Sequence, residues 1–352
     1  MSNTEHLANV MVEAFIAAVE SGVDLVPVVA DSTSTAKIAP FIKQFPGRLV
    51  NVGIAEQSMV GTAAGLALGG KVAVTCNAAP FLISRANEQI KVDVCYNNTN
   101  VKLFGLNAGA SYGPLASTHH AIDDLAVMRG FGNIQIFAPS TPRECRQIID
   151  YALAYQGPVY IRLDGKALPE LLDESYRFVP GAVLTLREGE DVALVATGST
   201  VHEVVEAAQQ LADLGIQAKV VSVPSIRPCD TAALLAALRP CGSVITVEEH
   251  NVNGGLGSLV AEVLAEAGGA LPCSGWGSRT GSTPPPPIAA GCASTTGLMP
   301  PPSLPWCKNG ADGLNARRVR RGRLLLQCAK RNDLILRRYP VQGIALLRKL
   351  KR

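Results

Sequence analysis

The stretch NVGIAEQSMVGTAAGLALGG, residues 51–70, decides how the rest of the chain is interpreted. It places Glu56 between a short apolar run and a segment rich in glycine and alanine, for which the spacing of apolar residues predicts a helix over 59–68. One interpretation of Glu56 is a helix-end residue stabilised by the helix dipole. The other is a functional carboxyl group whose pKa is raised by desolvation, because its neighbours in sequence are apolar: Val50, Val52, Ile54, Met59 and Val60.

Outward from this stretch, short apolar runs alternate with segments of helical periodicity. Strands that are apolar throughout need cover on both faces, which is typical of parallel sheets between layers of helices. The sequence therefore predicts an α/β fold with mostly parallel sheets. The expected helices are 4–22, 59–68, 86–96, 123–129 and 142–155, and the expected strands are 25–30, 72–75, 101–106, 134–138 and 159–163.

A second alternation of the same kind follows between residues 192 and 267. The interval 166–187 is less regular and contains Pro169, Pro180 and Gly181, so it is predicted to be a linker. We therefore expect one α/β domain over 1–165, the linker over 166–187, a smaller α/β domain over 188–271 and a tail over 272–352.

The tail differs in charge from the rest of the chain. Residues 273–352 contain 15 Lys and Arg against 2 Asp and Glu, a net charge of +13, whereas the preceding 272 residues hold 17 against 27, a net charge of −10. This Pro- and Arg-rich composition predicts a disordered basic tail. Two further hypotheses are a nucleic-acid-binding arm, disfavoured because no aromatic stacking residues accompany the arginines, and translation out of frame from about Cys273.

Targeting and redox signals are weak in this sequence. No run of eighteen apolar residues occurs, and the first residues, MSNTEHLANVMVEAF, are acidic where a secretory signal would be basic. The nine cysteines are scattered without a CxxC spacing. We therefore expect a cytoplasmic protein with free thiols and no membrane association.

In its twenty-residue context, the stretch 51–70 resembles the pyrimidine-binding motif of thiamine-diphosphate-dependent transketolases, in particular the C-terminal section, or small subunit, of split transketolases. The resemblance runs over about residues 5–271 and implies a pyrimidine-binding domain followed by a transketolase C-terminal domain. It also implies that Glu56 hydrogen-bonds N1′ of the cofactor's aminopyrimidine ring and acts in catalysis. Phe81 is then expected to pack on that ring, and Asp31, in the DSTST segment 31–35, to contact the cofactor.

The same resemblance suggests residues that face the substrate. His119, in the THHAIDD segment 118–124, corresponds to a histidine that contacts the sugar, and Thr35 is a candidate contact. Two substrate-facing positions of the family, a histidine and an aspartate, fall on Asn107 and Leu115. These differences argue against the specificity of ordinary pentose-phosphate transketolases.

The phosphate-binding arginine of the family falls on Gly165, so Lys166 and Arg162 are the candidates to replace it. In the smaller domain, the residues Glu248 to His250 and the GGLG segment 254–257 have the composition of an active site and a phosphate loop. We give both little weight, because the resemblance implies that this domain mainly builds the dimer.

No Gly-Asp-Gly motif, which binds Mg²⁺ for the cofactor diphosphate in transketolases, occurs in the sequence. The resemblance therefore implies that a separate N-terminal, or large, subunit supplies the Mg²⁺ ligands, in an assembly expected to be α2β2. The implied reaction is transfer of a two-carbon ketol unit from a ketose phosphate to an aldehyde. Residues 77–120 most resemble small subunits that act on apulose 4-phosphate. Alternatives are the β subunit of a 2-oxo acid dehydrogenase and a non-catalytic scaffold subunit.

Overall fold

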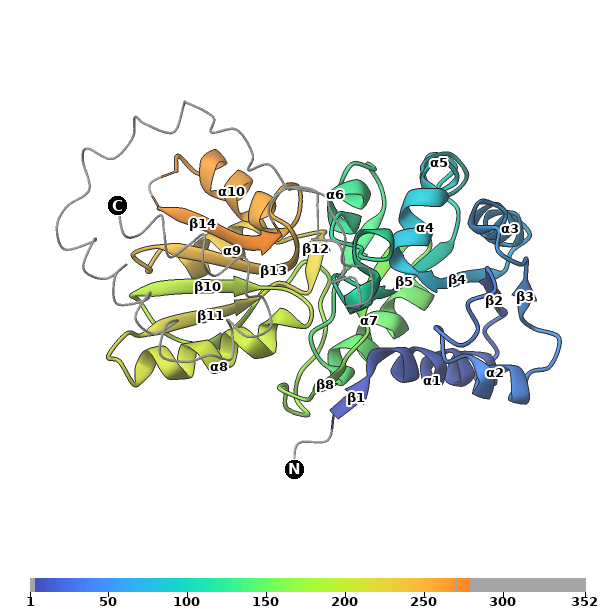
Figure 1. Ribbon diagram of the computed structural model, residues 1–352, viewed down its shortest axis with the longest axis horizontal. Helices are drawn as coiled ribbons and strands as arrows, with labels where there is room; N and C mark the ends of the chain where they lie inside the picture. Colours follow the sequence, from blue (N-terminus) through green and yellow to red (C-terminus); the bar gives the residue numbers. More distant parts are fainter. Residues whose placement is uncertain (1–3, 270, 279–352) are drawn as a thin grey trace, which may run out of the picture.

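The computed structural model describes residues 4–269 and 271–278, in which helices cover the faces of two large sheets (Figure 1). The predicted α/β class with mostly parallel sheets is confirmed. The larger sheet has seven strands in the order β12 (Ser225–Arg227), β6 (Gln135–Phe137), β7 (Val159–Asp164), β5 (Val101–Ala108), β4 (Val72–Ala78), β2 (Leu25–Val29) and β3 (Val50–Asn51). Among these strands, only β12 runs antiparallel to its neighbour.

Two separate apolar clusters cover the faces of the larger sheet. One face packs against α1 (Leu7–Glu20), α2 (Ala39–Gln44) and α7 (Pro142–Ala154). The other packs against α3 (Glu56–Leu68), α4 (Ala79–Arg85), the π-helix η1 (Ile90–Tyr96) and α6 (Asp124–Arg129). Two short helices, α5 (Asn87–Gln89) and the 3₁₀ helix η2 (Gly113–Thr118), lie in the connections. The apolar strands are thus buried on both sides, as their composition predicts.

The smaller sheet has five strands in the order β14 (Cys273–Ser278), β13 (Val244–Asn251), β10 (Val192–Ala196), β11 (Ala218–Ser222) and β9 (Leu184–Arg187), of which β9 is antiparallel to its neighbour. Its helices are α8 (Thr200–Ala212), α9 (Thr231–Leu238) and α10 (Leu256–Glu266). A two-stranded sheet joins β1 (Thr4–His6) to β8 (Ala167–Pro169).

Several segments differ from the prediction. The expected linker contributes β8 and β9, and β14 lies within the stretch assigned to the tail. The helix expected over 86–96 is present as α5 followed by the π-helix η1, whereas α4 was not expected; it begins at Ala79 with Pro80 in its first turn, where a missing N–H costs little. The hypotheses about residues 279–352 concern a stretch outside the described residues. Among the helices of residues 4–278 that the structure describes, none is long and apolar enough to cross a membrane.

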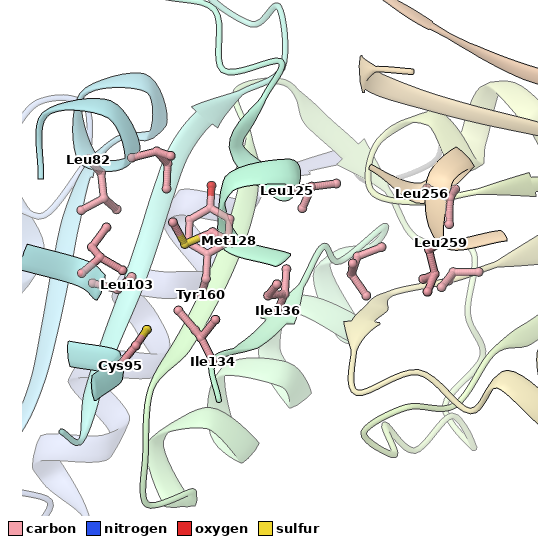
Figure 2. Packing of buried hydrophobic residues seen from close by; sticks show 14 of the residues in the cluster. Leu82, Cys95, Leu103, Leu125, Met128, Ile134, Ile136, Tyr160, Leu256 and Leu259 are labelled. Atoms are coloured by element: carbon pink, nitrogen blue, oxygen red, sulfur yellow. The ribbon is translucent and has the colours of Figure 1, made fainter. Parts of the chain in front are cut away.

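One apolar cluster continues from the larger sheet into the smaller half of the molecule. Figure 2 shows it passing from Leu82 and Leu103, past the ring of Tyr160, to Leu256 and Leu259 of α10. Strand β12 adds to this connection, because it follows β11 in the chain yet pairs with β6 of the larger sheet. The smaller half of the molecule is therefore joined to the larger sheet both by apolar packing and by strand pairing.

Candidate active site

Most of the polar residues singled out in the sequence lie where parallel strands of the larger sheet end. Asp31 follows β2, Asn77 lies near the end of β4, Asn107 near the end of β5, and Gly165 directly after β7. The carboxyl ends of parallel strands share one edge of a sheet, where ligands bind in open α/β folds. Glu56 joins this edge as the first residue of α3.

Glu56 is almost completely buried, with 4% of its surface exposed. Its Oε1 and Oε2 atoms accept hydrogen bonds from Nη1 of Arg85 at 2.8 and 2.9 Å, and Oε1 accepts a third from Nδ2 of Asn77 at 3.3 Å. The expectation of uniformly apolar surroundings is wrong in part, because Met59 is buried but Ile54 is 77% exposed. The carboxylate is thus one partner of an ion pair with Arg85, which the sequence had not singled out.

Aromatic rings gather beside this ion pair. The guanidinium of Arg85 lies 4.5 Å from the ring centre of Phe81, a cation–π distance. The ring of His119 packs edge-on against Phe81 at 5.1 Å and against Tyr112 at 5.3 Å. The structure therefore brings three predicted site residues, Glu56, Phe81 and His119, to one place.

The loop after β2 is tied to Glu56 by a relay of polar side chains. Ser32 donates a hydrogen bond from Oγ to Oδ1 of Asn77, whose Nδ2 donates to Glu56. Asp31 adopts a left-handed backbone, with φ of +57°, and its N–H donates to Oδ1 of Asn51 at 3.1 Å. Thr35 lies half-buried further along this loop. Asp31 is therefore held through its backbone, and the residue is exposed.

A second group surrounds the position where the resemblance expects an arginine. A side chain at Gly165 would meet Oδ1 of Asn107 at 2.8 Å and Cβ of Ser111 at 3.0 Å, and the N–H of Gly165 donates to Oγ of Ser111 at 3.1 Å. Asn107 itself has a left-handed backbone, with φ of +50°. Asn107 and Ser111 thus occupy the space beside this glycine.

The two candidate phosphate cations have different surroundings. Arg162 is buried and donates from Nε to Asp124 at 2.9 Å, so its charge is paired with a carboxylate inside the protein. Lys166 forms an ion pair with Glu203 of α8 at 3.0 Å, and 38% of its side chain is exposed. A partly exposed lysine in such a pair keeps donor capacity for an anion, so of the two only Lys166 suits a substrate phosphate.

The GGLG segment is not built as a phosphate loop. The N–H groups of Leu256 and Gly257, at the start of α10, donate to the carboxylate of Glu248 at 2.7 and 2.8 Å. Burial raises the pKa of Glu248, while His250 and these hydrogen bonds act in the opposite direction. The protein's own carboxylate therefore fills the anion site of this helix end.

Within residues 4–269 and 271–278, no group of three or more His, Cys, Asp or Glu side chains is arranged to hold a metal ion. The residues that sequence reasoning missed are Arg85, Asn77, Ser32 and Tyr112. The sequence spacing could have indicated Arg85, because it lies four residues after Phe81 and so shares a face of α4 with it.

Family models match most of the chain. Residues 6–170 match the model described as the transketolase pyrimidine binding domain, and residues 181–289 match the model of the transketolase C-terminal domain. The site described above lies mainly in the first of these two ranges.

Individual relatives agree with this match. The chain is 78% identical over 268 residues to an apulose-4-phosphate transketolase subunit of Actinobacillus succinogenes, covering 76% of this chain and 86% of the relative. It is 40% identical over 244 residues to the apulose-4-phosphate transketolase subunit of Phocaeicola vulgatus, covering 69% and 78%. A solved structure described as "Split gene transketolase, inactive beta4 tetramer" is similar with a TM-score of 0.72 at 38% identity, covering 79% of this chain and 90% of that one.

Proposed function

Since the chain belongs to the transketolase family, we propose that it is the small subunit of a split transketolase, which transfers a two-carbon ketol unit from a ketose phosphate to an aldehyde. The observation that carries the proposal is the buried carboxylate of Glu56, placed at the strand ends beside the ring of Phe81 and close to His119. The family's domains imply dependence on thiamine diphosphate.

The residues at the site fit an aminopyrimidine ring. The guanidinium of Arg85, a flat group bearing N–H donors, lies over Phe81 while donating to Glu56. An aminopyrimidine is also flat and nitrogen-bearing, so the same ring face and the same carboxylate would hold it. When bound, thiamine diphosphate supplies the electron sink that allows a carbon–carbon bond next to a carbonyl group to break.

The chain's own residues then have separate tasks. Glu56 holds and shares a proton at the ring nitrogen, and Asn77, itself fixed by Ser32, keeps the carboxylate in position. Phe81 packs on the ring, and Asp31 contributes to the cofactor site. His119 would orient the sugar.

Three more residues complete the proposed substrate site. Asn107 lies against Gly165, directly before Lys166 in the chain. We propose that Asn107 and Thr35 contact the sugar hydroxyl groups and that Lys166 contacts the phosphate group. The 78% identical relative is named for apulose 4-phosphate, and we propose the same substrate for this chain.

The rest of the cofactor site would come from a partner. The chain has no Gly-Asp-Gly segment to bind Mg²⁺, and large apolar side chains are exposed on or next to the helices that pack beside Glu56: Ile54 at 77%, Leu68 at 73% and Tyr96 at 85%. These residues lie at the two ends of α3 and at the end of η1, helices that pack together. Exposed apolar patches of this kind mark protein interfaces. We propose that a large subunit covers this face, brings the Mg²⁺ ligands and forms an α2β2 assembly.

Reconstitution with a large subunit tests the proposed reaction. The purified chain is mixed with a Gly-Asp-Gly-containing large subunit, thiamine diphosphate and Mg²⁺, and ketol transfer from apulose 4-phosphate is measured beside decarboxylation of 2-oxo acids. We expect ketol transfer that His119→Ala reduces, whereas His120→Ala, at the neighbouring residue, has a smaller effect. Decarboxylation without ketol transfer would show a 2-oxo acid dehydrogenase β subunit instead, and neither activity would leave a scaffold role.

A further inference from the structure

The loop that carries His119 begins and ends at two residues that are paired with each other. Gly109 and Ala121 pair as an antiparallel bridge, with hydrogen bonds of 3.0 and 2.9 Å between their N–H and carbonyl groups. We call this pair the neck and residues 110–120 the histidine loop. The chain enters and leaves the histidine loop through the neck, so the neck, together with the contacts of Ser111 with Gly165 and of His119 with Phe81, determines the position of His119.

The smaller half of the molecule holds the neck. The N–H of Asn251, at the end of β13, donates to the carbonyl of Ile122 at 2.6 Å. Arg162 donates from Nη2 to the carbonyl of Glu249 at 2.8 Å and to that of Ala121 at 3.4 Å. Arg162 is thus a bridge between the second strand of the neck and the end of β13.

The side chain of Glu249 lies directly against the first strand of the neck. A Cβ atom added to Gly109 would lie 2.7 Å from both Cγ and Oε2 of Glu249, a distance that real Cβ atoms do not show. Gly109 also has a left-handed backbone, with φ of +64°. The glutamate therefore packs on the bare backbone of Gly109, and the absence of a side chain there makes this contact feasible.

The arginine of this bridge is itself immobilised. Its Nε donates to Asp124 at 2.9 Å, and Asp124 also accepts a hydrogen bond of 2.7 Å from Tyr160. All three side chains are at most 2% exposed. A buried group with several fixed partners can hold a neighbouring segment in one geometry.

We propose that Glu249 is a positioning residue for the reaction: its side chain, packed on Gly109 from the smaller half of the molecule, fixes the neck and thereby the ring of His119. The catalytic part of this inference rests on the proposed function, whereas the structural part does not. Glu249 would act through His119 without touching the substrate.

Hydrogen exchange on the full chain alone tests the structural part. Glu249→Ala removes the packing on Gly109, so we expect amides of residues 110–120 to exchange about tenfold faster, while those of β10 and β11 keep their rates. Glu249→Gln, which keeps the shape of the side chain, should restore slow exchange. Glu266→Ala, an exposed glutamate of the same half, is the control. Equal exchange of residues 110–120 in Glu249→Ala and wild type would overturn the proposal.

A double-mutant cycle tests the contact itself. Gly109→Ala introduces a Cβ that meets Glu249, and we expect it to speed exchange of the histidine loop strongly. In the Glu249→Ala background the same substitution should have a clearly smaller effect, because the collision is removed and only the backbone strain is left. Effects that simply multiply would show that the two residues act independently.

Kinetics of the reconstituted complex test the catalytic part. We expect Glu249→Ala to lower kcat/KM for the sugar by about ten- to a hundredfold, the loss typical of a displaced substrate-orienting group, with cofactor affinity unchanged. Combining it with His119→Ala should add little further loss. A full additional loss in the double variant would contradict the proposal. If the complex shows no ketol transfer at all, the proposed function fails, and the exchange results still decide whether Glu249 fixes the neck.

Discussion

The two partners of the ion pair between Glu56 and Arg85 differ in their exposure. Glu56 is 4% exposed, whereas the side chain of Arg85 is 51% exposed, so the arginine is the partner free to move. Its guanidinium lies over Phe81, where we propose that the aminopyrimidine ring binds. The arginine would therefore have to move aside for the cofactor, while Asn77 stays to hold the carboxylate.

We expect Glu56→Gln to remove most turnover of the reconstituted enzyme without loss of fold or assembly. Glutamine is nearly isosteric but cannot share a carboxyl proton, so the loss should fall on kcat more than on KM, by about 10²- to 10⁴-fold. Hydrogen–deuterium exchange at C2 of the bound cofactor should slow in parallel. Glu266→Gln provides a matched exposed control. Full activity with unchanged exchange in Glu56→Gln would reduce Glu56 to a helix-end residue.

Loss of Arg85 should destabilise the chain only when Glu56 carries its charge. Arg85→Met leaves a buried carboxylate with Asn77 as its hydrogen-bond donor, and because Arg85 is half exposed we expect a cost of about 1 kcal/mol in the free energy of unfolding. In the Glu56→Gln background the cost should fall close to zero. Urea unfolding of the four chains measures this, and equal costs in both backgrounds would disprove the coupling.

At the residue scale, the sequence predicts some contacts of the site but not others. The resemblance to transketolases assigned Glu56 and Phe81 to one site. Arg85, by contrast, pairs with Glu56 across 29 positions, a separation at which a single sequence carries no pairing signal. For the same reason the sequence does not show that Arg162, a candidate phosphate ligand, forms a buried ion pair with Asp124. Burial of a charge depends on the packed fold rather than on neighbours in sequence.

At the element scale, strand β5 contains a fully buried lysine near its first residue. Lys102 donates from Nζ to Oδ1 of Asn100 at 2.6 Å and to the carbonyls of Tyr155 and Gly157 at 2.8 and 2.6 Å. The two carbonyls lie between α7 and β7, so the lysine ties the turn before β7 to β5. Burial lowers the pKa of Lys102 to about 7.

This burial predicts a pH dependence of stability. In the unfolded chain Lys102 returns to its ordinary pKa of 10.5, so between about pH 7 and 10 the unfolded state binds more protons than the folded state. The free energy of unfolding should therefore rise with pH in this window, with a slope of at most about 1.4 kcal/mol per pH unit. The free energy of unfolding of wild type minus that of Lys102→Met should become more positive from pH 7 to 9, while exposed Lys91→Met gives no such trend. A constant difference would mean that the three oxygen acceptors keep Lys102 protonated.

Elements with long apolar runs were predictable, and short elements were not. Strands β2, β4, β5 and β7 fall within or around runs of apolar residues recognisable in sequence. Strands β8 and β9 have three and four residues and form only because β1 and β11 offer edges for pairing. Such short strands carry no periodic pattern of their own, which is why the interval 166–187 was predicted to be a linker.

At the scale of the whole molecule, the two halves are joined by a continuous apolar core and by hydrogen bonds around the neck. The prediction of two α/β halves came from two successive alternations of strands and helices. Their joining was not predictable, because the pairing of β12 with β6 and the apolar cluster that contains both Tyr160 and Leu256 connect residues far apart in sequence. We propose that this chain contributes only the pyrimidine side of the site and that the remainder attaches at the face that exposes Ile54, Leu68 and Tyr96.

We propose that this chain provides half of a cofactor site and that a large subunit provides the other half. Calorimetric titration of the purified chain with thiamine diphosphate and Mg²⁺, alone and after addition of a Gly-Asp-Gly-containing large subunit, tests it directly. We expect no tight binding by the chain alone and micromolar or tighter binding by the mixture, on the scale where 1 µM corresponds to about −8 kcal/mol. Micromolar binding by the chain without a partner would contradict the claim.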